Sequence, residues 1–129
     1  FGGSPVSCAA AMANIQAMKE EKLVENSAAR GKQLTDRLGK FGKDSKLVGE
    51  VRGKGLMIGL ELVRDKATKE AADDEAKKVR DLCRENGVLV GRGGPLANVI
   101  RLQPPLTITA EQADQAASVL EKALREVGG

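Results

Sequence analysis

Arg101 is the residue whose setting in this 129-residue chain most strongly suggests chemistry. It follows Val99-Ile100, precedes Leu102 and stands close to Pro104-Pro105. Because side chains alternate along a strand, Arg101 points away from the face that carries Ile100 and Leu102. A guanidinium held on a rigid strand can bind a carboxylate through two parallel hydrogen bonds. The residues alone favour a plainer alternative, an arginine on the open face of an edge strand that pairs with a helix carboxylate.

Two glycine-rich segments invite comparison with phosphate-binding loops. Gly53-Lys54-Gly55-Leu56-Met57-Ile58-Gly59 has one residue too many before its last glycine to be a dinucleotide fingerprint. It also leads into a strand, whereas phosphate binding needs a helix N-terminus. Gly91-Arg92-Gly93-Gly94 could form a nest of backbone amides for a phosphate. We favour turns at both places, with Gly59 admitting a close neighbour to its strand.

Other reactive groups are few. The chain has no histidine, which removes the commonest general base and metal ligand, and we expect no metal site. Cys8 and Cys83 lie on the apolar sides of helical patterns, which predicts free thiols and a reducing, cytoplasmic compartment. The 12 lysines have the pattern of surface charges. None has the desolvated setting that a lysine needs to bind a carbonyl cofactor.

Composition indicates one domain over residues 1–129 with an aliphatic core. Hydrophobic residues make up 41% and charged residues 30%, as in ordinary soluble domains, but aromatic residues are only 2%. The net charge of +3 comes from interspersed signs without an aromatic platform, which argues against nucleic-acid binding. No apolar run approaches the roughly 20 residues that span a bilayer, so we expect no membrane segment.

Apolar residues at three- and four-residue steps predict four helices. The first two cover residues 5–20 and 23–41, and the third runs to Asn86-Gly87. The fourth starts at the capping box Thr109-Ala110-Glu111-Gln112. Ser4, before Pro5, is expected to cap the first helix with its hydroxyl. We expect that helix to bury an apolar stripe formed by Cys8, Ala11, Met12, Ile15 and Met18.

Three segments have the pattern of strands. Residues 48–63 alternate with period two and predict the longest strand. Residues 88–90 and 99–102 predict two short neighbouring strands, joined by a turn at 91–95. The expected order is ααβαββα. This is an α+β fold of two layers, a small and mainly antiparallel sheet packed under helices on one face.

Three segments, in order and at suitable spacing, resemble the end of class III aminotransferases. They are Phe1-Gly2-Gly3-Ser4-Pro5-Val6, residues 51–62 with the sequence VRGKGLMIGLEL, and residues 98–106 with the sequence NVIRLQPPL. Residues 87–94 are most similar to the alanine-glyoxylate aminotransferase branch. The resemblance covers nearly the whole chain. It implies the small C-terminal domain of a fold-type-I enzyme dependent on pyridoxal 5'-phosphate, whose large domain carries the cofactor lysine.

The resemblance also implies roles for particular residues. Arg101 falls at the arginine that binds the substrate α-carboxylate. Gly2 and Gly3 fall near the cofactor phosphate of the partner subunit in a homodimer, and the phosphate-binding threonine of the family comes just before Phe1. The substrates would be an amino acid and a 2-oxo acid. Without the large domain, this chain would have no catalytic residue, bind no cofactor and be inactive.

One other class of function remains open from the sequence. The chain could be a non-catalytic regulatory or interaction module of α+β fold that binds amino acids or a protein partner. Within the aminotransferase class, a decarboxylating or mutase relative is the nearest competitor. If the large domain is missing, apolar surface on the first helix and the sheet should be exposed, and the chain should tend to self-associate.

Overall fold

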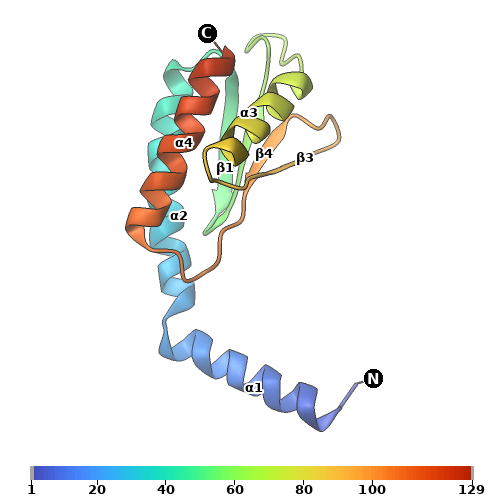
Figure 1. Ribbon diagram of the computed structural model, residues 1–129, viewed down its shortest axis with the longest axis vertical. Coiled ribbons are helices and arrows are strands. Elements are labelled where there is room, and N and C mark those ends of the chain that lie inside the picture. The colour runs from blue at the N-terminus through green and yellow to red at the C-terminus, as the bar shows by residue number, and fades with distance from the viewer. Residues whose placement is uncertain (1, 129) are drawn as a thin grey trace.

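The structure is a computed structural model that describes residues 2–128 (Figure 1). Three helices pack on a sheet, and the first helix projects from this body at the N-terminal end (Figure 1). The elements in chain order are α1 (Pro5–Glu20), α2 (Leu23–Asp44), β1 (Val48–Lys54), β2 (Met57–Leu62), α3 (Asp73–Glu85), β3 (Gly91–Gly93), β4 (Val99–Leu102) and α4 (Ala110–Gly128).

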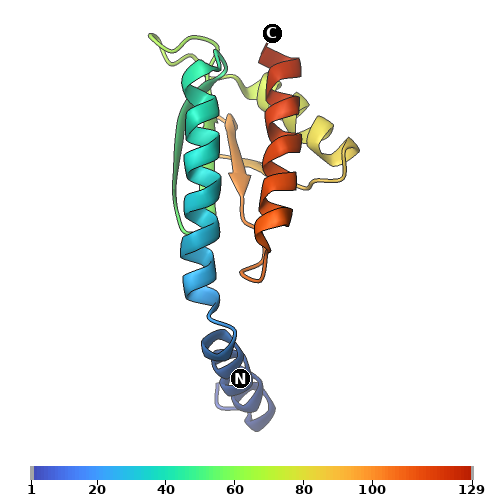
Figure 2. The same cartoon turned by 90° about the vertical axis from the view of Figure 1, so that its left-hand side faces the viewer.

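The four strands form one antiparallel sheet in the order β1-β2-β4-β3. Helices α2 and α4 lie side by side along the sheet (Figure 2), and α3 packs against α4. Alternate side chains of β2 and β4 are buried beneath these helices, and the side chains between them face away. The predicted α+β class with two layers is confirmed.

The core is aliphatic, as the composition predicted. Its fully buried large side chains come from the helices and the sheet alike, and include Leu34, Leu38, Leu60, Leu62, Ile100, Leu120 and Leu124. Asn98 is the one buried polar residue in the described chain, and it joins β4 to β2. Its Nδ2 donates to the carbonyl oxygen of Leu62 at 2.8 Å, and its own carbonyl accepts from the Leu62 amide at 2.8 Å.

The prediction of one long strand over residues 48–63 is wrong. The segment forms β1 and β2, which pair with Lys54 opposite Met57 and turn through Gly55-Leu56. Gly55 has φ +55°, in the left-handed region that glycine enters without strain. The alternation of Leu56, Ile58, Leu60 and Leu62 begins inside the turn, so it does not mark the boundary between the two strands. The observed order is therefore ααββαββα.

Helix α2 holds this turn by a contact between two backbones. A Cβ atom on Gly31 would lie 2.2 Å from the carbonyl oxygen of Gly55, so only glycine allows the approach. One helical turn earlier, Ser27 Oγ accepts a hydrogen bond from the Leu56 amide at 3.2 Å. The hairpin is thus fixed to one face of α2.

The predicted strand at residues 88–90 is also wrong in position. The strand is β3, Gly91–Gly93, and it pairs with β4, so the predicted neighbour relation is confirmed. The turn lies later, where Gly94 has φ +85° and the Ala97 amide donates to the Gly94 carbonyl at 3.0 Å. The glycines at 91–94 suggested a turn, but Gly91 and Gly93 belong to β3, where they leave room for the Arg101 side chain of β4.

The bounds of α1 agree with the prediction, but its surroundings do not. The Ser4 hydroxyl forms no capping bond, and the Ser4 carbonyl instead accepts from the Cys8 amide at 2.9 Å. The predicted buried stripe is wrong, since no residue of α1 is buried in the described chain. Met12 is 72% exposed and Ile15 54% exposed. The helix therefore presents apolar side chains that nothing in residues 2–128 covers.

The other helices lie close to their predicted places. Helix α2 continues to Asp44 rather than ending near residue 41, because Gly42 is buried against the side chain of Val48. The capping box at the start of α4 is confirmed. The Thr109 amide donates to Gln112 Oε1 at 3.0 Å, and the Gln112 amide donates to Thr109 Oγ1 at 3.2 Å. Over residues 2–128, no helix has the length and apolar character to cross a membrane.

Two glycines of α2 give a matched test of the contact between α2 and the β1–β2 turn. Replacing Gly31 with alanine forces a Cβ into the Gly55 backbone and should lower the free energy of unfolding by about 1–3 kcal/mol. Gly39 has no atom within 4 Å of the place where its Cβ would be. Gly39→Ala should therefore raise the free energy of unfolding by about 0.5–1 kcal/mol, because alanine favours helix. Urea unfolding followed by circular dichroism measures both, and equal effects of the two changes would contradict the contact.

The two cysteines should differ in reactivity. Cys8 is exposed, whereas Cys83 is 0% exposed and burial raises the pKa of its thiol to about 11. At pH 8 the folded chain should show one thiol that reacts quickly with a disulfide reagent and a second that reacts only on unfolding. Cys8→Ala should abolish the fast reaction. The Cys83 thiol ionises near pH 9 in the unfolded chain but stays neutral up to about pH 11 in the folded chain. The stability that the buried neutral thiol contributes should therefore be lost as the pH rises from about 9 to 11. A fast reaction of both thiols in the folded chain would show that Cys83 is not enclosed.

Candidate functional site

Arg101 lies on the open face of the sheet, away from the helices. It is exposed between the buried residues Ile100 and Leu102, so the orientation predicted from alternation is confirmed. Strand β4 lies between β2 and β3, however, and is not an edge strand. A strand with a neighbour on each side is held more firmly than an edge. Arg101 therefore has a rigid base for its long side chain.

Glycines surround Arg101 on this face. Gly59 of β2 and Gly91 of β3 stand directly opposite it on the two neighbouring strands. Gly93 lies two residues along β3, and a Cβ there would be 3.2 Å from Arg101 Nε and 3.3 Å from Cζ. The Arg101 side chain thus lies along β3, over Gly91 and Gly93. Because these three glycines have no side chains, they leave space for the guanidinium.

The nearest acidic side chains of the open face already have a partner. Arg52, on β1, lies in the same cross-strand row as Gly59. Arg52 Nη1 donates to Glu50 Oε2 at 2.6 Å and to Glu61 Oε2 at 2.7 Å. The hydrogen bond with Glu61 is the main cause that raises the pKa of Arg52 above its ordinary value. Both carboxylates are therefore held by Arg52 rather than by Arg101.

Arg101 forms no ion pair with any other residue between 2 and 128, so the helix carboxylate expected in the plainer alternative is not found. Several other arginines do form ion pairs, namely Arg37, Arg52, Arg64, Arg80 and Arg84. A planar guanidinium with its donors unused by the described chain is suited to bind an external carboxylate through two hydrogen bonds. Arg101 is therefore a candidate for binding an external carboxylate.

A shallow hollow of about 250 Å³ lies beside Arg101. The residues that line it include Arg52, Met57, Gly59, Val99 and Gln103. Met57 is 67% exposed, so the hollow combines apolar and cationic surface. The sequence patterns placed Met57 and Gly59 on one strand face but gave no reason to bring them next to Arg101. Pairing between β2 and β4 does so.

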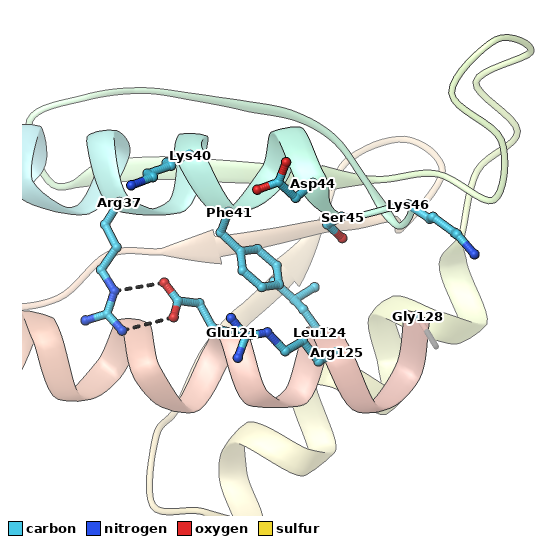
Figure 3. Close-up of a pocket in the computed structure, with 10 residues that line it drawn as sticks. All are labelled: Arg37, Lys40, Phe41, Asp44, Ser45, Lys46, Glu121, Leu124, Arg125 and Gly128. Carbon is cyan, nitrogen blue, oxygen red and sulfur yellow. Dashed lines mark hydrogen bonds and ion pairs between the residues drawn. The ribbon is translucent and has the colours of Figure 1, made fainter.

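A larger cavity, of about 450 Å³, lies between the C-terminal halves of α2 and α4 (Figure 3). Arg37 there donates to the two carboxylate oxygens of Glu121 at 2.8 and 3.0 Å. Arg125 stacks over the Phe41 ring, with its guanidinium carbon 5.2 Å from the ring centre. These side chains already bind one another and join the two helices. We therefore place the candidate site at Arg101 and not in this larger cavity.

The residues that the sequence linked to the cofactor lie at the surface. All 12 lysines are exposed, as the sequence predicted, so none has the desolvated environment that a carbonyl cofactor needs. Gly2 and Gly3 are exposed and precede α1, and a Cβ on either would meet no atom within 4 Å. Within residues 2–128, no group of histidine, cysteine and acidic residues could hold a metal ion.

Comparison with known proteins gives consistent matches. The family model of aminotransferase class III matches residues 1–124. A leucine/methionine racemase from Thermococcus litoralis is 45% identical over 97% of this chain and 28% of its own length. The mitochondrial alanine–glyoxylate aminotransferase 2 homolog 2 of Arabidopsis thaliana is 42% identical over 88% of this chain and 24% of its own length.

Solved structures agree with these relatives. A Bacillus anthracis aminotransferase superposes with a TM-score of 0.91 and 39% identity, over 98% of this chain and 29% of that chain. An amine transaminase from an uncultivated Pseudomonas species, in its PLP-bound form, has a TM-score of 0.86 and 42% identity over 96% of this chain and 28% of its own. The chain thus spans about a quarter of the length of its relatives. Sequence and fold together show that it belongs to the class III aminotransferase family.

Proposed function

We propose that this chain is the small C-terminal domain of an aminotransferase that depends on pyridoxal 5'-phosphate, with Arg101 binding the substrate α-carboxylate. Membership of the class III family supports the assignment, as does the match to about a quarter of each relative. The reaction transfers an amino group from an amino acid to a 2-oxo acid. The exposed guanidinium of Arg101, on a central strand and without an internal counterion in residues 2–128, is the observation that carries the proposal.

The chemistry of the substrates explains why a single arginine suffices for this role. An amino acid and its 2-oxo acid differ at the α-carbon but carry the same α-carboxylate. A planar guanidinium can hold that group in both halves of the reaction through the same pair of hydrogen bonds. The charged Arg101 would orient the α-carbon, while Met57 and Val99 offer apolar surface for the rest of the substrate.

The cofactor would be held mainly by parts of the full-length protein other than this chain. Pyridoxal phosphate, when bound, supplies an electron sink for bonds at the α-carbon. The described chain has only exposed lysines, so the cofactor lysine belongs to the large domain in this proposal. Gly2 and Gly3 are proposed to lie near the cofactor phosphate of the partner subunit. Their lack of side chains leaves their surroundings open to such an approach.

The surface of α1 supports a covering large domain. A helix of 16 residues without a buried residue in the described chain is unusual, and large apolar side chains on it are exposed. Large apolar side chains exposed together on one helix indicate a contact with another part of a protein. We propose that the large domain, in a homodimer of the full-length enzyme, covers α1.

Substitution of Arg101 in the full-length enzyme tests the proposed function. Arg101→Ala should lower kcat/KM for the amino acid by about 30- to 5,000-fold, which corresponds to the 2–5 kcal/mol lost when one partner of a buried charge pair is removed. Arg84→Ala is the matched control, because Arg84 is an exposed arginine of α3 whose ion pair with Asp81 measures 3.9 Å. The control should leave kcat/KM unchanged. The assay should follow amino transfer to several 2-oxo acids and racemisation of the donor, and an unchanged kcat/KM in Arg101→Ala would remove Arg101 from the site.

The isolated chain should not transaminate. Incubation with pyridoxal phosphate, reduction with borohydride and peptide mass spectrometry should find no lysine of this chain labelled in stoichiometric amount. The physical reason is that all 12 lysines are exposed and solvated, so none favours the cofactor over the others. The full-length enzyme is the positive control and should carry one labelled lysine outside this chain. Stoichiometric labelling of a single lysine within residues 1–129 would contradict the prediction.

A further inference from the structure

We infer that Gly93 is a positioning residue for Arg101, and that its missing side chain sets where the guanidinium lies on the open face. The inference rests on the proposed role of Arg101 in binding a carboxylate. It concerns β3, the short edge strand whose residues have no part in the proposed chemistry themselves. Of its three residues, Gly91 and Gly93 face Arg101, and Arg92 faces the other way.

The backbone of β3 does not require glycine at position 93. The glycines with positive φ in the described chain are Gly3, Gly55, Gly87 and Gly94, so neither Gly91 nor Gly93 needs the left-handed region. Glycine in a strand also weakens it, because the residue loses more conformational freedom on folding and has no side chain to pack. Space for a neighbouring group therefore explains these glycines better than backbone conformation.

That neighbouring group is the end of the Arg101 side chain. A Cβ on Gly93 would stand 3.2 Å from Nε and 3.3 Å from Cζ, closer than ordinary contact. A Cβ on Gly91 would stand 3.5 Å from Arg101 Cβ and Nε, which is ordinary van der Waals distance. The two positions therefore differ: Gly91 tolerates a methyl group, whereas a methyl group at Gly93 displaces the guanidinium.

Strand β3 has little freedom to move aside in place of the arginine. It is hydrogen-bonded to β4 along its length, and Arg92 Nη1 donates to the Asp73 carbonyl at the start of α3. The guanidinium, by contrast, is the end of a flexible side chain. A methyl group at Gly93 should therefore leave the fold intact and move the guanidinium. Recognition of a carboxylate depends on distances to within a fraction of an ångström, so such a shift changes binding.

The test uses the full-length holoenzyme and a graded series. Gly93→Ala should raise KM for the amino acid by roughly 3- to 10-fold and Gly93→Val by more, since a displacement of 1 Å costs on the order of 100-fold. The kcat should change less than KM, and the thermal midpoint should stay the same. Gly91→Ala, on the same strand, is the matched control and should behave as the unaltered enzyme. Crystal structures of the two alanine variants should show a displaced guanidinium only with Gly93→Ala.

A double substitution separates positioning from a general effect on the strand. With Arg101→Ala already present, Gly93→Ala should cause no further loss, because the displaced group is gone. If Gly93→Ala lowers kcat/KM by the same factor with and without Arg101, the inference is overturned. It is also overturned if Arg101→Ala is impaired while both Gly93 variants keep an unchanged KM. If Arg101→Ala itself leaves kcat/KM unchanged, the proposed function fails first, and that outcome is distinguishable from the others.

Discussion

Helix α2 and the β1–β2 turn meet backbone to backbone at Gly31 and Gly55, and the register of the sheet follows from this contact. With the turn held at Gly55-Leu56, Lys54 must pair with Met57, and Arg52 with Gly59. Alternation then sends the leucines of β2 beneath the helices and Gly59 to the open face. The two hydrogen bonds between Asn98 and Leu62 align β4 with β2, which puts Arg101 opposite Gly59.

Local patterns predicted the helices well because their signals lie within a few residues. The capping box at Thr109 forms as expected, and the bounds of α1 agree with the periodicity. Periodicity does not identify the partner of an apolar face, so it predicted a buried stripe on α1, whereas no residue of α1 is buried within residues 2–128. The single strand over residues 48–63 failed for a related reason. Its apolar alternation, from Leu56 to Leu62, starts inside the turn and gives no sign of it, and the turn is held by a contact with α2 that lies more than 20 residues away in sequence.

The direction of Arg101 could be predicted, but its surroundings could not. Alternation alone places Ile100 and Leu102 on one face and Arg101 on the other. Gly59 comes from β2, the second strand of the hairpin, and Gly91 and Gly93 come from β3, which follows α3. Only the pairing of these strands with β4 brings the glycines next to Arg101. In the sequence, Gly91 and Gly93 look like turn residues. Their place in a strand is explained by the Arg101 side chain, which lies over them.

The division of the sheet into a covered face and an open face has an evolutionary consequence. Met57, Val99 and Gln103 border the hollow beside Arg101, while the leucines that stabilise the domain lie on the opposite side of the same strands. Under the proposed role of Arg101, changes at the hollow would alter ligand preference and leave the packed leucines untouched, at little cost in stability. Under that proposal, substitutions that change the substrate could accumulate on this surface while the packed leucines stay the same. Selectivity and stability would then depend on opposite faces of the same strands.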